Sequence, residues 1–163
     1  MNDQSMNDQS GLHDFDFLIG DWTVAHQRLK QRLAGCTEWE AFGGTMKLWS
    51  LVGSQVNIDD NVIELPSGAY RAASLRSFDL TTGQWAIRWI DSRHPHQVDP
   101  AVVGLFQDGI GTFFGTDIFE GRPIKIRFVW SDIAPDSATW QQAFSDDGGA
   151  TWETNWVMKF QRA

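Results

Sequence analysis

Cysteine is nearly absent from this sequence, since Cys36 is the single one among 163 residues. A lone cysteine excludes a disulfide within the chain and is typical of a reducing compartment, so we expect a cytoplasmic protein. No run of apolar residues approaches the roughly 20 that a membrane-spanning helix needs. Basic residues are also few, because 13 Lys and Arg face 21 Asp and Glu for a net charge of −8. These shortages argue against a membrane and against nucleic acid as partners.

The remaining composition is that of a folded domain. Apolar types make up 42% of the residues and charged types 21%, and the length suffices for one hydrophobic core. The first ten residues duplicate a five-residue unit and have neither the basic region nor the apolar region of a secretory signal. We therefore expect residues 1–11 to be a tail and residues 12–163 to form a single domain.

Strand signals dominate the chain after the tail. Segments 85–91 and 123–130 alternate in side-chain character with a period of two, and clusters of Gly, Pro, Asp and Ser separate such runs. We expect about ten short strands, with separate strands over 36–43 and 45–51. Residues 12–20 are the one helical candidate, a short turn that plugs one end. Such a meander predicts an all-β fold, a single antiparallel sheet that closes into a β-barrel, because closure removes unprotected edges.

Residues 17–22, FLIGDW, contain a Gly-x-Trp motif where the first strand should begin. The motif resembles that of lipocalins and of the wider calycin superfamily. This resemblance implies that Trp22 closes one end of the barrel as an apolar stopper and that a basic residue of the last strand covers it. Lys159 and Arg162 are the two candidates for that basic residue.

Longer stretches are similar to a bacterial family of calycin-like barrels that is described as a domain of unknown function. The stretches are FDFLIGDW, RSFDLTTGQWAIRWIDS and FSDDGGATWETNWVMKFQR, and the similarity runs over nearly the whole chain after residue 12. It implies a lipocalin-like or fatty-acid-binding-protein-like barrel, and it implies no particular activity.

Residues 145–152, SDDGGATW, match the Asp-box, a hairpin turn that is repeated around sialidase propellers. In such a turn Asp147 accepts backbone N–H bonds, while Gly148 and Gly149 adopt positive φ angles. A propeller needs one copy per blade and the enzyme needs a tyrosine nucleophile, whereas this chain has one copy and a single tyrosine, Tyr70, without acidic neighbours in sequence. We therefore interpret the segment as a structural turn and not as part of a glycosidase.

Charged residues inside the predicted strands are a further signal. In the hairpin over 70–91, one face contains Arg76, Trp89 and Asp91. If that face points inward, as we favour, Arg76 needs a partner, and the candidates are Asp91, Asp117 or a ligand carboxylate. If the face points outward, the arginine is solvated and the aromatic residues form a patch for a homodimer.

The histidines give two candidate positions. His26 follows Trp22 by four residues along a strand and so shares its inward face, either as a hydrogen-bonded structural group or as a holder of a polar ligand group. His94 and His96 lie in DSRHPHQVD, residues 91–99, where a proline between them favours a solvated loop over a metal site. No histidine follows His96 to serve as an axial haem ligand. We expect no metal and no cofactor.

The barrel interior is left as the candidate site, because no Ser-His-Asp set or phosphate-binding loop is recognisable. We expect a soluble protein that binds a small apolar or aromatic molecule bearing one polar or anionic group. The expected site residues are Trp49, Trp89, Trp130 and Trp156 as walls, His26 and Arg76 as holders of the polar group, and Asp91 and Asp117 beside them.

Two alternatives stay open at this point. The same interior could belong to an enzyme of small metabolites, an isomerase, cyclase or decarboxylase type, with His26 or Asp91 as acid or base. A deep pocket with a His–carboxylate pair would favour that reading. Alternatively, side chains fill the barrel and the protein acts as a homodimeric interaction module, which the lack of any cavity would favour.

Overall fold

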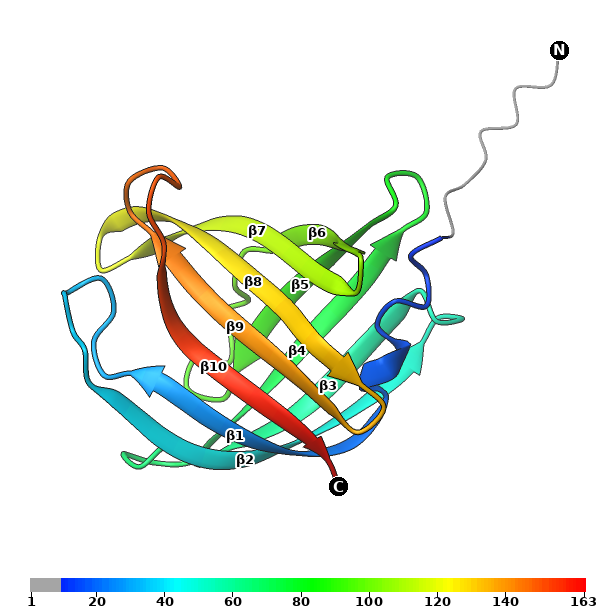
Figure 1. Ribbon diagram of the computed structural model, residues 1–163, viewed down its shortest axis with the longest axis horizontal. Coiled ribbons are helices and arrows are strands. Elements are labelled where there is room, and N and C mark those ends of the chain that lie inside the picture. Colours follow the sequence, from blue (N-terminus) through cyan, green and yellow to red (C-terminus); the bar gives the residue numbers. More distant parts are fainter. Residues whose placement is uncertain (1–9) are drawn as a thin grey trace, which may run out of the picture.

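Ten strands follow one another around a closed antiparallel barrel in the computed structural model, which describes residues 10–163 (Figure 1). The strands are β1 (Gly20–Leu29), β2 (Trp39–Leu51), β3 (Val56–Ile63), β4 (Tyr70–Asp79), β5 (Gln84–Asp91), β6 (Val102–Gln107), β7 (Ile110–Phe119), β8 (Arg122–Ala134), β9 (Ser137–Ser145) and β10 (Glu153–Arg162). Each strand pairs with its neighbours in sequence, and β1 also pairs with β10, which closes the sheet. The predicted all-β barrel of about ten strands is confirmed.

Strand β2 differs from the prediction because it runs unbroken where we expected two strands with a break at Gly44. A Cβ atom at Gly44 would lie 2.3 Å from the carbonyl oxygen of Val62 on β3. The glycine therefore allows β2 and β3 to approach closely and does not mark a turn.

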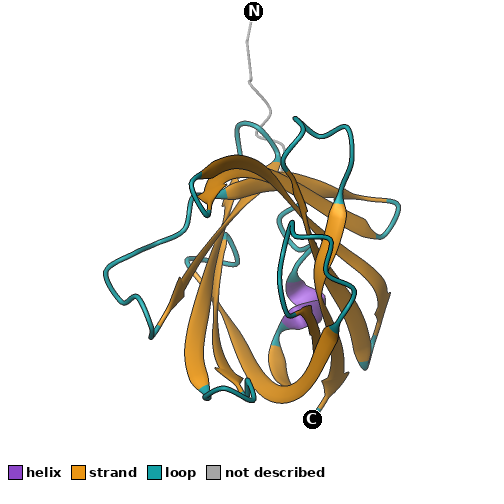
Figure 2. Ribbon diagram, turned by 90° about the vertical axis from the view of Figure 1, so that its left-hand side faces the viewer, coloured by secondary structure: helices purple, strands orange, loops and turns teal. Residues whose placement is uncertain are grey.

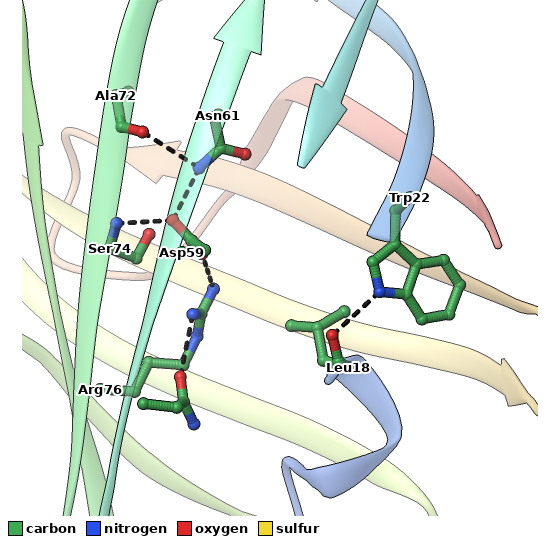
Figure 3. Close-up of polar contacts among 8 residues, drawn as sticks. Leu18, Trp22, Asp59, Asn61, Ala72, Ser74 and Arg76 are labelled. Carbon is green, nitrogen blue, oxygen red and sulfur yellow. Dashed lines mark hydrogen bonds and ion pairs between the residues drawn. The ribbon is translucent and has the colours of Figure 1, made fainter. Parts of the chain in front are cut away.

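One end of the barrel is closed by a plug, which we define as residues 15–18 and which includes the 3-10 turn η1 (Asp16–Leu18). Phe15 and Leu18 are fully buried, and Figure 2 shows the helical turn within the ring of strands. The Trp22 indole donates a hydrogen bond of 2.9 Å to the Leu18 carbonyl (Figure 3). The Arg162 guanidinium carbon lies 4.1 Å from the centre of the Trp22 ring. The predicted stopper is confirmed, and Arg162 is the basic residue that covers it.

The start of the chain falls only partly within the described residues. Of the predicted tail at 1–11, residues 1–9 lie outside them. Gly11 already contacts the barrel, because its carbonyl oxygen accepts a hydrogen bond of 3.0 Å from the Trp85 indole. Within residues 10–163, no helix is long and apolar enough to cross a membrane.

The β9–β10 hairpin contains the segment that matches the Asp-box. Asp147 accepts hydrogen bonds from the Ser145 hydroxyl and from both the hydroxyl and the backbone N–H of Thr151. These bonds hold the pKa of the Asp147 carboxyl well below its usual range. Gly148 and Gly149 have φ angles of 75° and 95°. The prediction of a structural turn with two positive-φ glycines is confirmed.

Alternation along the strands separates the inside of the barrel from the outside. In β4, Ala72, Ser74 and Arg76 are buried, whereas Arg71 and Leu75 on the opposite face of the strand are exposed. The face of the 70–91 hairpin that contains Arg76 therefore points inward, as we favoured. Polar and charged side chains thus enter the barrel alongside the aromatic ones.

Candidate functional site

A cavity of about 240 Å³ lies inside the barrel. At one end it is lined by Arg76 and Trp130, which both contact the ring of Phe15 in the plug, and we call this end the floor. At the other end it is lined by Arg32 and Asp99, in the connections that follow β1 and β5, and we call this end the mouth. Ligand pockets usually measure roughly 300–1,000 Å³, and a cavity of about 150 Å³ holds benzene. The space suits a ligand of one or two rings.

One wall of the cavity is polar and comes from β3 and β4. Asp59 accepts hydrogen bonds from the Asn61 side-chain amide at 2.6 Å and from the Ser74 backbone N–H at 2.7 Å (Figure 3). Its other carboxylate oxygen lies 2.8 Å from the Arg76 guanidinium, which also donates to Asn57 at 3.2 Å. The side chains of Asp59 and Arg76 are at most 5% exposed. A buried charge is tolerated only when it is paired and hydrogen-bonded, and this wall meets both conditions while remaining neutral overall.

The rest of the wall is aromatic. The rings that line the cavity come from β5, β7, β8, β9 and β10, and they are Trp89, Phe119, Phe128, Trp130, Trp140, Phe144, Trp156 and Phe160. Trp156 is at the centre of this set, since it makes edge-to-face contacts with Trp140 at 5.6 Å and with Trp89 at 6.1 Å. Such contacts orient the rings against one another and leave flat apolar surfaces toward the cavity. The cavity is therefore polar on one side and aromatic on the other.

Arginines gather at the mouth, although the chain as a whole is acidic. Arg28 lies over the rings of Phe42 and Trp156, at 6.0 and 5.4 Å, and its nearest carboxylate is that of Glu40 at 3.7 Å. Arg32 lies 5.6 Å from the ring centre of Phe119. Among residues 10–163, no carboxylate lies within ion-pair distance of Arg32. Burial and then the charge of Arg28 lower the pKa of the Arg32 guanidinium, while the charge of Glu120 acts in the opposite direction.

A third arginine of the mouth is already paired. Arg93 lies 2.9 Å from the Asp91 carboxylate and 3.7 Å from the centre of the Tyr70 ring. Its hydrogen bonds lower the pKa of Asp91. Arg93 is thus balanced by its own carboxylate, whereas Arg28 and Arg32 face mainly aromatic rings.

His26 is buried directly behind the aromatic wall and does not line the cavity. Its Nδ1 accepts a hydrogen bond of 3.1 Å from the Trp156 indole, and its ring stacks on Phe42 at 4.8 Å. Burial, followed by the nearby Arg28 charge, lowers the pKa of His26 to about 4. The histidine is therefore neutral at pH 7, and the bond to Trp156 orients that ring.

The structure brings most of the predicted site residues together. Five of them line the cavity: Arg76, Trp89, Asp91, Trp130 and Trp156. Trp49 does not line it, because Met46 and Leu48 point inward on β2 and the period of two turns Trp49 outward, where it is 38% exposed. Asp117 is half-buried and outside the lining, and it accepts the backbone N–H of Ile118. That any of these side chains binds a ligand stays a prediction.

The partner of Arg76 is a residue that the sequence analysis missed. It is Asp59 on β3, whereas Asp91 pairs with Arg93. Alternation in VNIDDNVI, residues 56–63, does place Asn57 and Asp59 on one face of the strand. A polar stripe normally indicates an outward face, so the pattern argued against burial. The burial of this polar stripe is explained only by Arg76 on β4, which pairs with Asp59.

The histidines of residues 91–99 lie away from the cavity lining. His94 and His96 are exposed in the connection between β5 and β6. Within the part of the chain that the structure describes, no group of three or more His, Cys, Asp or Glu side chains is placed to hold a metal ion.

Comparisons with known proteins support the architecture. Neither a protein-family model nor a curated protein sequence matches the chain. Among solved structures, the S-type phycobiliprotein lyase CPES from Guillardia theta is similar, with a TM-score of 0.58 and 11% sequence identity over 91% of this chain and 90% of that chain. At this identity the likeness concerns the fold alone. Membership of the bacterial family named above stays a prediction, and the calycin-like barrel is confirmed.

Proposed function

We propose that this protein binds a small apolar or aromatic molecule, bearing one polar or anionic group, in the cavity of its barrel. The observation that supports the proposal is a cavity of about 240 Å³ with an aromatic wall and two arginines that lie over aromatic rings at its mouth. Barrels of eight to ten strands either fill with side chains or hold one small ligand, and this interior is hollow. Aromatic surfaces suit a planar or apolar body, and guanidinium groups suit an anion.

The enzyme alternative finds less support. The His–carboxylate contact among residues 10–163 joins His13 and Asp16 at 2.8 Å on the exposed surface and not in the cavity. His26 is occupied by the Trp156 indole, and Asp91 is occupied by Arg93. An acid or base that serves catalysis must reach the substrate, whereas His26 does not line the cavity and Asp91, which does, is held by Arg93.

The module alternative required a filled barrel, and the cavity argues against it. A homodimer stays a separate expectation, because a carrier can also self-associate. Apolar side chains on the outer face of the barrel, such as Trp49, Leu75, Val103 and Phe114, would be available for it.

The proposal is tested by the melting temperature of the protein in a panel of small ligands. The panel contains aromatic and aliphatic acids, alcohols and hydrocarbons, including decanoate, indole and naphthalene derivatives. A ligand at 100 times its Kd stabilises the folded state by about 2.7 kcal/mol. For a chain of this length we expect a rise in melting temperature of about 5–10 °C. No rise with any member of the panel would contradict the proposal.

A matched pair of variants assigns the effect to the cavity. Ser74 on β4 points into the cavity, whereas Ser77 on the same strand lies on the outer face. Ser74→Phe should fill the space and abolish the rise in melting temperature. Ser77→Phe introduces the same side chain on the outer face of the barrel and should keep the rise in melting temperature. Equal ligand responses in the two variants would place binding elsewhere on the protein.

A further inference from the structure

We propose that the ligand is a planar aromatic acid that binds in one orientation, with its anionic group at Arg28 and Arg32 in the mouth and an uncharged oxygen acceptor at Arg76 and Trp130 on the floor. This inference rests on the proposed function, which names a polar or anionic group without saying where it binds. It moves that group from the predicted holders, His26 and Arg76, to the mouth.

The floor is unsuited to an anion because its charges are already balanced. Asp59 lies 2.8 Å from the Arg76 guanidinium, and both side chains are almost completely buried. A second anion beside Arg76 would face the Asp59 carboxylate in a region of low dielectric constant, where like charges repel strongly. His26 offers no positive charge either, since burial lowers its pKa to about 4.

The floor does offer hydrogen-bond donors that lack acceptors. Arg76 is 4% exposed and Trp130 is 2% exposed, and both line the cavity. Within residues 10–163, neither Nε of Arg76 nor Nε1 of Trp130 has a hydrogen-bond partner. Both groups can only donate, and a buried donor without an acceptor is unfavourable. A carbonyl or hydroxyl oxygen at the inner end of the ligand would satisfy them.

The mouth has the opposite character. Arg28 and Arg32 lie over aromatic rings, and the charge of Arg28 lowers the pKa of Arg32 while that of Glu120 raises it. The one carboxylate near Arg28 is that of Glu40, at 3.7 Å. Nε of Arg28 has no hydrogen-bond partner among the described residues. Guanidinium groups bind carboxylates with charge-assisted and often bidentate bonds, so an anion here would relieve the repulsion and gain strong contacts.

The ligand body must connect these two ends across the aromatic wall. Trp89, Trp140 and Trp156 line the cavity and present flat apolar surfaces. A volume of about 240 Å³ suits one or two rings. The ligand class is therefore an aromatic carboxylate with an oxygen substituent on the edge opposite its carboxylate.

Four naphthalene probes test the two ends separately by equilibrium dialysis at pH 7.5. They are 6-hydroxy-2-naphthoate, 2-naphthoate, 2-naphthol and naphthalene, which carry both groups, the carboxylate alone, the hydroxyl alone and neither. We expect 2-naphthoate to bind about tenfold or more tightly than naphthalene. We expect the hydroxyl of 6-hydroxy-2-naphthoate to add a further gain of roughly three- to tenfold over 2-naphthoate.

Two variants assign each gain to its end of the cavity. The double variant Arg28→Gln/Arg32→Gln should lose the carboxylate gain and keep the hydroxyl gain. Trp130→Phe keeps a ring and removes the donor, so it should lose part of the hydroxyl gain and keep the carboxylate gain. Arg71→Gln, at an exposed arginine of β4, is the control and should change neither.

The outcomes separate this inference from the proposed function. Naphthalene binding without a carboxylate gain, or a carboxylate gain that survives in the double variant, overturns the inference and leaves the carrier function in place. Failure of all four probes to bind also overturns the inference, and the wider ligand panel of the melting experiment then decides the carrier function. If Trp130→Phe does not fold, as judged by circular dichroism, the hydroxyl gain in the natural sequence decides the role of the floor.

Discussion

The two ends of the barrel use arginine in opposite ways. At the plug end, Arg162 donates to the carbonyl oxygens of Phe17, Ile19 and Pro135 at 2.8–3.0 Å and covers the Trp22 ring. At the mouth, Arg28 and Arg32 rest on aromatic rings and have few acceptors. Both ends use arginine, but the guanidinium at the plug end has hydrogen-bond acceptors in reach and those at the mouth have few.

This difference teaches how to distinguish a structural arginine from one available to a ligand. A guanidinium has five donors, so one that is satisfied by fixed carbonyl groups joins segments of the chain together. One that faces rings keeps its donors and its charge for an incoming anion. The plug end should therefore determine stability, and the mouth should determine binding.

The largest expected effect is at the plug end. Trp22 is 1% exposed, and Trp22→Ala should lower the free energy of unfolding by about 3–5 kcal/mol because it leaves a large cavity. Trp89→Ala is the matched change toward the mouth, where the side chain is half-buried and borders the cavity, and it should cost less than about 2 kcal/mol. Urea denaturation measures both values. Equal losses would contradict the contrast between the two ends.

The next largest effect on the free energy of unfolding is expected from the removal of an ion pair, which should cost more beside the floor than at the mouth. Asp59→Ala leaves the buried Arg76 charge unpaired and should cost about 3 kcal/mol, the lower end of the usual range because Asn57 still accepts a bond from Arg76. Asp91→Ala removes the partner of Arg93, whose side chain is 44% exposed, and should cost about 1 kcal/mol or less. Denaturant unfolding of the two variants gives the comparison. The prediction would be wrong if Asp91→Ala lowered the free energy of unfolding more than Asp59→Ala does.

A smaller effect is the pH dependence that His26 contributes. Its pKa is lowered to about 4 in the folded protein from 6.5, so the unfolded chain takes up this proton more readily. The contribution of neutral His26 to the free energy of unfolding is fully present above pH 6.5 and declines as the pH falls toward 4. Between pH 7 and 5 we expect the free energy of unfolding to fall by about 2 kcal/mol.

The variant His26→Gln isolates that contribution. A glutamine oxygen can still accept the hydrogen bond from the Trp156 indole but does not titrate. The difference in unfolding free energy between pH 7 and pH 5 should therefore be about 2 kcal/mol smaller in the variant. An unchanged pH dependence would show that His26 is not the group responsible.

Much of the fold was predictable because it depends on local patterns. The period of two in the strands, the Gly-x-Trp motif before β1 and the glycines of the β9–β10 turn each indicated a structure that the barrel contains. The unbroken β2 was not predictable, because Gly44 serves the approach of a neighbouring strand and not a local turn. A glycine alone does not reveal which of these roles it has.

The cavity was predictable only in part. Trp89, Trp130, Trp156 and Arg76 were placed in the interior from strand alternation. Trp49 was misplaced because its strand was predicted with a break, which left its facing direction undetermined. Asp59 was missed because a polar stripe usually faces water.

By itself, the sequence determined that this chain forms a barrel with one sealed end, since periodicity and turn residues act between neighbours along the chain. Tertiary structure alone decided which charges neutralise each other and which remain available. Asp59 and Arg76 meet across two strands, and Arg28 meets Trp156 from the opposite end of the chain. Electrostatic balance depends on distance in space, and that distance is set only when β1 pairs with β10 and the barrel closes.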